Sequence, residues 1–587
     1  METFEKPRWG ARMLSPDKAF FPIWAPDCNS MRLALGDRVV DMHADEDGWF
    51  SVTCAATPGS LYQFVLPDGT RVSDPASRAQ AKGVEGPSIL TPPRDPALSR
   101  QWQGRAWEEA IIYEIHIGTF TEEGTFLGAI PRLAELAACG ITAIELMPVA
   151  QFSGLRGWGY DGVLQFAPHH SYGPPQALKA LIDAAHQVGL MVLLDVVYNH
   201  FGPHGNALPQ YASQFFEDGR TTPWGKAVAF DNLNVRHYFL ENALYWLRGF
   251  GFDGLRLDAV QHIKGTRKPD FLSELAETVS KAFPGTPTHL IVEDDERRRD
   301  LIEYRQGRRL MFDASWNDDF HHAAHTLVTQ ETTGHYEPYA DAPSRMLAEA
   351  IAIGFPVAAA EIAEPVTPRA RVAFLQNHDQ VGNRAKGERL RSLVGDSVMD
   401  VLMSLLLLSP QIPLLFMGDD YGETQPFLYF ADYDGELAEA IRRGRFEEAE
   451  NFGWERAKDT GTLPDPIGVA AFSTSKLDWA RARLPQGLRR RSQLNELTRI
   501  RARYVMPLRA LQDCTILPTS QGVVAVDWRF DDGTLKMRAN LSQSPQSIPR
   551  PGDAIIWSIG WHCDKVGVLA APGIVVSVGP PKQGGFK

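Results

Sequence analysis

The chain contains few cysteines, and their placement gives no sign of a metal site or a disulfide framework. The five are Cys28, Cys54, Cys139, Cys514 and Cys563, and they include no CxxC pair. This spacing excludes the common structural zinc patterns. Scattered, unpaired thiols are typical of a reducing compartment, where disulfides do not persist. We therefore expect free thiols, no bound metal and no cofactor.

The sequence also lacks a secretory signal, a clear membrane span and an excess of positive charge. Its N-terminus, METFEKPRWGARM, has no apolar segment of the signal-peptide kind. The apolar run 401–418 is interrupted at 409–413 by Ser, Pro, Gln and Pro, which predicts a buried helix, a turn and a buried strand. The net charge of -13 opposes binding to phosphate backbones. We expect a cytoplasmic protein that binds neither nucleic acid nor membrane.

Both ends of the chain are predicted to be β-structure. Near the N-terminus, apolar or alternating runs at 20–24, 31–35 and 62–66 lead to a Pro-Asp-Gly turn and then to a proline-rich linker at 91–100. Beyond about residue 508, the runs 522–530 and 534–541 flank a DDG turn and predict a hairpin. We predict an N-terminal Ig-like β-sandwich at 1–95 and a C-terminal β-sandwich at 509–587.

The middle of the chain, 105–508, alternates short apolar runs with helical stretches. Eight runs are found: Ile111–Ile117, Ile141–Met147, Met191–Val197, Phe252–Asp258, His289–Glu293, Leu310–Asp313, Val372–Leu375 and Ile412–Met417. Stripes at helical spacing lie between them, at Leu178, Leu181, Ile182 and Ala185 and at Val235, Tyr238, Phe239, Ala243, Trp246 and Phe250. This pattern predicts an α/β fold, a (β/α)8 barrel with loop insertions.

Ionisable residues gather where four of these strands end, which is where such barrels carry their chemistry. The segments are DVVYNH (195–200), GLRLD (254–258), IVEDD (291–295) and FLQNHD (374–379). In the second segment, Leu255 and Leu257 should face the helices, whereas Arg256 and Asp258 should face the barrel mouth. We expect the guanidinium to lower the pKa of Asp258, as a carboxylate nucleophile requires.

Cleavage of an acetal with retention needs two carboxyl groups about 5–5.5 Å apart, one ionised and one protonated. Asp258 is the candidate nucleophile. Glu293 is the candidate general acid, because burial and the neighbouring Asp294 and Asp295 should raise its pKa. Asp379, next to His378, could stabilise the oxocarbenium-like transition state. Taken singly, Asp258 could instead cap a helix, Glu293 could belong to a solvated charged face, and 377–379 could be a simple turn.

The four segments, in this order, resemble those of the α-amylase superfamily, glycoside hydrolase family 13. The resemblance implies that Asp258 is the nucleophile, Glu293 the acid/base and Asp379 the third carboxylate. It also implies that Arg256, Asp195, His200 and His378 hold the sugar at subsite −1. One position departs from the amylase pattern, since Gln261 stands before His262 where a lysine is frequent.

Longer stretches at 156–173, 312–336, 375–390 and 416–430 resemble members of that family that release trehalose. The resemblance implies hydrolysis of the α-1,4 bond next to a terminal trehalose of a maltooligosyltrehalose, with a synthase as partner in the pathway. Loop residues suited to sugars add Trp158, Tyr160 and Asp318 to the candidates, together with His262. A glucan branching or debranching enzyme, whose N-terminal domain is similar, and an inactive sugar-binding member remain as alternatives.

Overall fold

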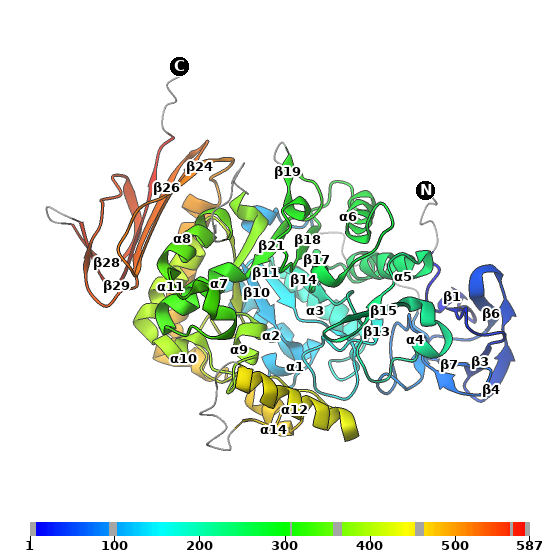
Figure 1. Ribbon diagram of the computed structural model, residues 1–587. Coiled ribbons are helices and arrows are strands. Elements are labelled where there is room, and N and C mark those ends of the chain that lie inside the picture. The colour runs from blue at the N-terminus through cyan, green and yellow to red at the C-terminus, as the bar shows by residue number, and fades with distance from the viewer. Residues whose placement is uncertain are drawn as a thin grey trace.

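The computed structural model describes residues 7–92, 102–305, 308–355, 367–451, 463–563 and 567–581, and its centre is a closed barrel of eight parallel strands (Figure 1). All residues of these strands are buried. In barrel order they are β10 (Ile112–Ile115), β11 (Ala143–Leu146), β14 (Met191–Val196), β17 (Gly254–Leu257), β18 (His289–Val292), β21 (Ala314–Asn317), β22 (Arg371–Phe374) and β23 (Ile412–Phe416). The predicted (β/α)8 barrel is therefore confirmed.

Seven of the eight strands overlap the predicted runs, but the sixth prediction, Leu310–Asp313, is wrong. The strand begins at Ala314, which pairs with Ile291 of β18. Leu310 is exposed, and Phe312 packs into the main core just before the strand. The Asp313 carboxylate accepts the backbone N–H of Leu290 at 2.8 Å. The apolar residues at this point lead into the strand and are not part of it.

Helices follow most strands and cover the outside of the barrel. They are α1 (Ile117–Phe120), α2 (Phe126–Ala138), α3 (Pro175–Gln187), α4 (Leu208–Tyr211), α5 (Leu233–Leu244), α6 (Phe271–Ala282), α7 (Asp318–Thr329), α8 (Pro343–Ile353), α9 (His378–Gly382), α10 (Leu390–Val394), α11 (Asp396–Leu408), α12 (Gly435–Asn451), α14 (Val469–Thr474) and α15 (Pro485–Ile500). Both predicted helical stripes are buried, in α3 and in α5 with its π-helical continuation Tyr245–Phe250. Between β18 and β21, the described residues form only a 3-10 turn, Asp300–Ile302, and a short hairpin of β19 (Tyr304–Arg305) and β20 (Arg308–Arg309).

The barrel strands separate two hydrophobic clusters. Alternate residues such as Ile144, Leu255 and Leu257 belong to the main cluster beneath the helices. The residues between them fill the lumen in a second cluster, which includes Ile112, Ala143, Leu193, Ile291, Ala314, Trp316 and Leu414. Leu255 and Leu257 therefore lie on the helix side, as predicted, and Arg256 lies on the lumen side.

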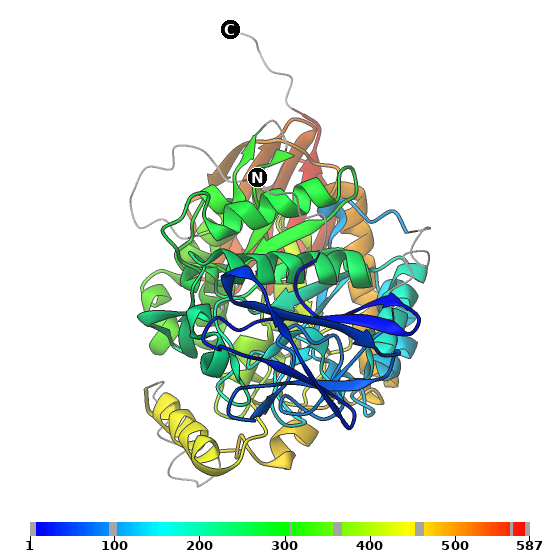
Figure 2. The same ribbon diagram turned by 90° about the vertical axis from the view of Figure 1, so that its right-hand side faces the viewer.

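Two β-sheets lie against one side of the barrel at the N-terminal end of the chain (Figure 2). Their strands are β1 (Arg12–Ser15), β2 (Lys18–Trp24), β5 (His43–Ala44) and β6 (Trp49–Ala55) in one sheet, and β3 (Arg32–Leu35), β4 (Arg38–Asp41), β7 (Leu61–Val65), β8 (Arg71–Val72) and β9 (Ser88–Ile89) in the other. Trp9 packs edge-on against Trp49 and against Tyr238 of α5, with ring centroids 4.8 and 5.0 Å away. The predicted linker lies largely outside the described residues.

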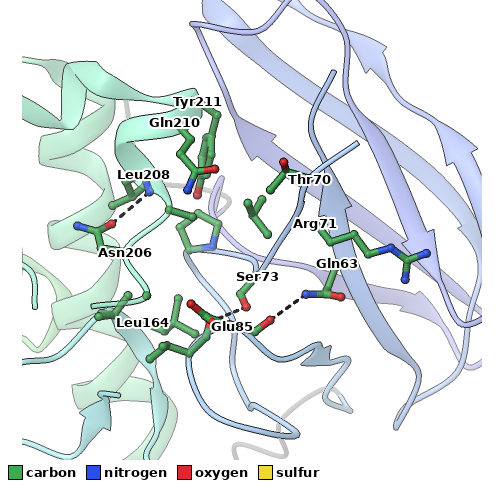
Figure 3. Close-up of a pocket in the computed structure, with 16 residues that line it drawn as sticks. Gln63, Thr70, Arg71, Ser73, Glu85, Leu164, Asn206, Leu208, Gln210 and Tyr211 are labelled. Carbon is green, nitrogen blue, oxygen red and sulfur yellow. Dashed lines mark hydrogen bonds between the residues drawn. The ribbon is translucent and has the colours of Figure 1, made fainter. Parts of the chain in front are cut away.

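A cavity of about 450 Å³ lies where this region meets the barrel (Figure 3). Some of its polar side chains bond to the loops that line it. The Ser73 hydroxyl lies 2.7 Å from the carbonyl oxygens of both Val84 and Gly86 and can donate to either, and Gln63 donates to the carbonyl of Glu85 at 3.1 Å. These bonds hold the loops in place, and none of the predicted site residues lines the cavity.

The C-terminal region forms an antiparallel sheet on the opposite side of the barrel (Figure 1). Its strands are β24 (Leu511–Ile516), β25 (Val523–Phe530), β26 (Gly533–Asn540), β27 (Gln546–Ser547), β28 (Ala554–Cys563) and β29 (Gly567–Gly579). The predicted hairpin is β25–β26. The run 401–418 is the end of α11 followed by β23, as predicted. Within the described part of the chain, no helix has the length and apolar character needed to cross a membrane.

Candidate active site

Arg256 of β17 joins three of the predicted carboxylates at the C-terminal end of the barrel. Its Nη1 donates to Oδ2 of Asp195 at 2.7 Å and to Oδ1 of Asp258 at 2.9 Å, and its Nη2 lies 2.8 Å from Oε2 of Glu293. Strand register explains the grouping, since Arg256 is paired with Asp195 of β14 on one side and with β18 on the other. The guanidinium is fully buried. Side chains from three neighbouring strands thus meet on a single cation.

Asp258 is held in place from more than one side. The Asn199 amide donates to its Oδ2 and to its backbone carbonyl, both at 2.9 Å, and Glu293 lies close enough to share a hydrogen bond with its carboxylate. Burial raises the pKa of Asp258, Arg256 lowers it, and the charge of Asp195 raises it again. The net shift is upward. Arg256 lowers the pKa of Asp258 as predicted, but it does not set the net shift, because burial and Asp195 outweigh the guanidinium.

Glu293 has the environment of a protonated carboxyl group. Burial raises its pKa most, Arg256 opposes the rise, and the charges of Asp258 and Asp379 add to it, giving a pKa of about 8. Its Oε2 accepts the backbone N–H of Ala259 at 3.0 Å. The predicted rise is confirmed, but the charges come from Asp258 at the end of the adjacent strand and from Asp379 rather than from Asp294 and Asp295.

Ala259, directly after Asp258, has a φ of 40°, a left-handed conformation that is unusual outside glycine. Its N–H donates to the carboxyl of Glu293, so the turn out of β17 ties the two candidate carboxyl groups together. Backbone strain of this kind is often found at functional sites, where the surrounding contacts maintain it.

His378 lies between two carboxylates on the opposite side of the opening. Its Nδ1 is 2.6 Å from Oε1 of Glu114, whose other oxygen accepts the backbone N–H of His378, and its Nε2 is 3.4 Å from Oδ1 of Asp379. Burial lowers the pKa of His378, but Asp379 and Glu114 outweigh that effect and raise it to about 9. Asp379 is 39% exposed at its side chain, so it faces the opening.

Two aromatic residues from the loop after β11 support this side. The Tyr160 hydroxyl donates to Oδ2 of Asp195 at 2.7 Å, and its ring stacks on His378 with centroids 5.0 Å apart. Trp158 is buried, packs edge-on against His378 and donates from Nε1 to the carbonyl of Leu428 at 3.0 Å. Tyr160 therefore lies at the edge of the site, with Trp158 behind His378.

His200 and His262 meet at Trp224, which projects from the hairpin of β15 (Phe216–Thr222) and β16 (Gly225–Val228). Trp224 stacks on His200 with centroids 5.3 Å apart and meets His262 edge-on at 5.4 Å. Although it is a large apolar side chain, Trp224 is 46% exposed. Burial holds the pKa of His200 at about 4, so this ring is neutral at physiological pH.

Asp318 is the first residue of α7 and faces the carboxyl groups from the sixth strand. The Gln380 amide donates to its Oδ1 at 3.3 Å. Burial raises the pKa of Asp318 most, and the charges of Glu293, Asp295 and Asp379 raise it further. The predicted site residues therefore lie at the same end of the barrel, with Asp318 and His262 on the flanks of the group.

Four residues near the site were not among the predicted ones: Glu114, Asn199, Trp224 and Gln380. Two of them carried a signal, because Asn199 lies within DVVYNH and Glu114 is a charged residue inside an apolar strand. Gln380 directly follows Asp379. Trp224 lies on a hairpin inserted after β14, where the sequence has no feature that points to the barrel mouth.

Comparison with known proteins agrees with this geometry. A family model described as the α-amylase catalytic domain matches residues 72–220, and one for a domain of unknown function matches 513–576. Malto-oligosyltrehalose trehalohydrolases from Arthrobacter ramosus and a Rhizobium species are 36% and 37% identical to this chain. Each alignment covers 91% of this chain. The alignments also cover 95% of the Arthrobacter protein and 93% of the Rhizobium protein.

Other relatives are similar over different extents. A 1,4-α-glucan branching enzyme from Shewanella baltica is 29% identical over 51% of this chain and 47% of its own length. A crystal structure from Salmonella typhimurium, described as an α-amylase, has a TM-score of 0.91 and 43% identity, covering 97% of this chain and 99% of that one. Pullulanase from Paenibacillus barengoltzii, at 18% identity and a TM-score of 0.71, shares the fold.

Proposed function

This chain belongs to the malto-oligosyltrehalose trehalohydrolase family of the α-amylase superfamily and is a glycoside hydrolase, and from that premise we propose that Asp258, Glu293 and Asp379 carry its chemistry. The substrate is a maltooligosyltrehalose, cut at the α-1,4 bond next to the terminal trehalose. The observation that supports these roles most strongly is the bridging of Asp258 and Glu293 by one guanidinium, with Glu293 favouring its protonated form.

In the first step, Asp258 attacks C1 of the glucose at subsite −1 and forms a glycosyl ester. The C1–O4 bond breaks at the same time, and Glu293 gives its proton to O4, so that trehalose leaves as a neutral alcohol. Both carboxyl groups contact the single guanidinium of Arg256, which supports a retaining pair about 5–5.5 Å apart rather than an inverting pair about 6.5–9.5 Å apart.

In the second step, Glu293 accepts a proton from water while the water oxygen attacks C1. The ester bond to Asp258 breaks, the maltooligosaccharide leaves, and both carboxyl groups return to their starting states. Asp379, supported by His378, stabilises positive charge at the sugar ring. Asp195, Tyr160 and His200 bind hydroxyls at subsite −1, with Trp158 behind them.

The enzyme must distinguish trehalose from maltose where the leaving group binds, on the side of the scissile bond opposite subsite −1. His262 and Asp318 flank this side in our proposal. The α,α-1,1 link turns the last glucose to a different angle, so fixed polar groups can pair with one disaccharide and leave unpaired partners with the other. Such mismatches cost about 3–4 kcal/mol for two or three contacts.

The test compares kcat/KM for maltotriosyltrehalose and maltopentaose, which contain equal numbers of glucose units. We expect a preference of two to three decades for the first, equivalent to about 3–4 kcal/mol. Equal rates would leave a general α-glucan hydrolase. Transfer to a branched product in place of free trehalose would replace the proposal with a branching enzyme, the function of the Shewanella relative.

We also propose a pathway position and a compartment. A substrate that ends in an α,α-1,1 link requires an enzyme that first isomerises the reducing end of a maltodextrin, so a synthase should supply it. A cytoplasmic location is supported by the cysteines. In the described part of the chain Cys28, Cys54, Cys139 and Cys514 are free thiols.

A further inference from the structure

Glu145 of β11 is a buried carboxyl group that the mechanism above does not use. It is 1% exposed, and its strand neighbours Ile144 and Leu146 pack beneath the helices, so its own side chain points into the lumen. Strand register places it beside Glu114 of β10 and Leu193 of β14. Asp195 is the next inward residue along β14, and it is paired with Arg256. Glu145 therefore lies directly below the cluster of charges around Arg256.

The hydrogen bonds already made by its neighbours show which of their oxygens can still accept a hydrogen bond from Glu145. Within the described residues, neither oxygen of Glu145 has a hydrogen-bond partner. Both oxygens of Glu114 are occupied by His378. Oδ2 of Asp195 accepts from Tyr160 and from Arg256, whereas Oδ1 of Asp195 is buried and has no partner. Among these neighbouring carboxylates, Oδ1 of Asp195 is the acceptor left over.

We propose that Glu145 is a positioning residue that remains a neutral acid and donates a hydrogen bond to Oδ1 of Asp195. The contact needs a rotation of the Glu145 side chain or one bridging water, since the two groups are not in direct hydrogen-bond contact here. Asp195 then has both oxygens engaged and holds Arg256 in the orientation that joins Asp258 and Glu293. The role rests on the proposed function, because Arg256 matters through those two groups.

The charges around Glu145 support the neutral form. Burial raises its pKa most, and Asp195 and Glu114 raise it further, while Arg256 and His378 oppose the rise. The net shift is well upward. An ionised Glu145 would be a fourth carboxylate competing for the positive charge of Arg256, whereas the neutral acid leaves that charge to Asp195, Asp258 and Glu293.

Two substitutions separate positioning from simple packing. Glu145→Gln keeps a donor of the same size, and we expect kcat and the pH profile to stay within about threefold of wild type. Glu145→Met removes the donor but fills the space. We expect it to lower kcat by about tenfold with little change in KM, and to lower the melting temperature, because Oδ1 of Asp195 is left buried without a partner.

A merely structural Glu145 predicts the opposite for Glu145→Met, with a higher melting temperature and unchanged kcat, and that result would overturn the proposal. A Gln variant as slow as the Met variant would also overturn it, since the donor would then not matter. If the Met variant does not fold, the Gln variant and the spectrum described next decide the question.

Infrared difference spectra of the unliganded wild type and Glu145→Gln give a readout that needs no substrate. We expect the wild type to show the C=O stretch of a protonated carboxylic acid that the variant lacks, and this band should shift in Asp195→Asn. No such band, or a band insensitive to Asp195, would overturn the proposal. If trehalose release fails but the band behaves as expected, the proposed function is at fault and the placement of the proton stands.

Discussion

The two halves of the barrel lumen are built from opposite kinds of side chain, although the same strands supply both. On four strands an apolar residue is followed, two positions later, by an ionisable one: Ile112 and Glu114, Ala143 and Glu145, Leu193 and Asp195, Ile291 and Glu293. Two residues along a strand is about 6.6 Å. The side chains that face the lumen therefore change from apolar to ionisable between one inward-facing residue and the next along the same strand.

The two halves of the lumen contribute differently to stability and to chemistry. The lower half of the lumen, lined by the apolar residue of each pair, removes apolar surface from water, and its contribution to the free energy of folding depends on packing. The upper half buries several carboxylates around Arg256, an arrangement that costs desolvation and does not need to stabilise the fold. Substitutions in the two halves should then affect different measurements, which the following predictions test from the largest effect to the smallest.

The largest effect is expected in the upper half, from removing either candidate catalytic carboxyl group. Asp258→Ala and Glu293→Gln should each lower kcat by about a thousandfold or more, because each removes a bond-forming or proton-donating group. The melting temperature should stay the same or rise, since Asp258→Ala removes one of several crowded carboxylates and Glu293→Gln exchanges a neutral acid for a neutral amide. Activity within about tenfold of wild type, or about 1.4 kcal/mol of barrier, would remove that residue from the mechanism.

The lower half should respond in the opposite way. Leu193 is fully buried in the lumen cluster. Leu193→Ala should destabilise the fold by about 2–5 kcal/mol through the cavity it leaves, measured by thermal unfolding. The position of the alkaline limb of the pH profile should not move. As a control, Leu14→Ala, at a 56% exposed residue of β1, should change stability by less than about 0.5 kcal/mol. A moved limb in Leu193→Ala would show that the two halves are coupled.

The same alternation decides how much of the molecule the sequence could predict. Apolar runs of strand length predicted the barrel well, because its strands are buried on both faces and lie between amphipathic helices. Apolar character is misleading at Leu310–Asp313, because these residues precede the strand, which begins at Ala314. Polar Asn317 inside β21 shows that strand membership there depends on pairing with β22 rather than on composition.

The site was predictable to the extent that it lies at strand ends. Asp195, Arg256, Asp258 and Glu293 could be grouped because parallel strands end at one face. The pKa of Asp258 could not be predicted, since it depends on how burial and Asp195 balance Arg256 in three dimensions. Trp224 could not be placed, because nothing local fixes where an inserted hairpin folds back.

The pH dependence tests the upper half with a smaller, graded effect. Glu293 must be protonated to act as the acid, and its pKa is raised to about 8. Activity should therefore be retained below that value and lost as pH rises through it. Glu293→Gln should abolish the alkaline limb in whatever activity remains. If the limb is unchanged in that variant, another group is the acid.

The smallest effect is expected at the rim, beyond both halves of the lumen, where Trp224 is the test. The exposed indole of Trp224 stacks on His200 and contacts His262 edge-on, so its other face can stack on a sugar ring. Exposing an indole to water does not stabilise the fold. Trp224→Ala should raise KM by roughly three- to tenfold, in line with about 0.5–1.5 kcal/mol for aromatic contacts, with a smaller change in kcat. Trp224→Phe should recover part of the loss. Phe446→Ala, at a similarly exposed aromatic residue of α12, is the matched control and should leave KM unchanged. Equal KM values for Trp224→Ala and the control would mean that the indole only shields His200. A large fall in kcat alone would mean instead that Trp224 acts by holding His200 at subsite −1. Trp224 would then support the catalytic site and not bind sugar at its rim.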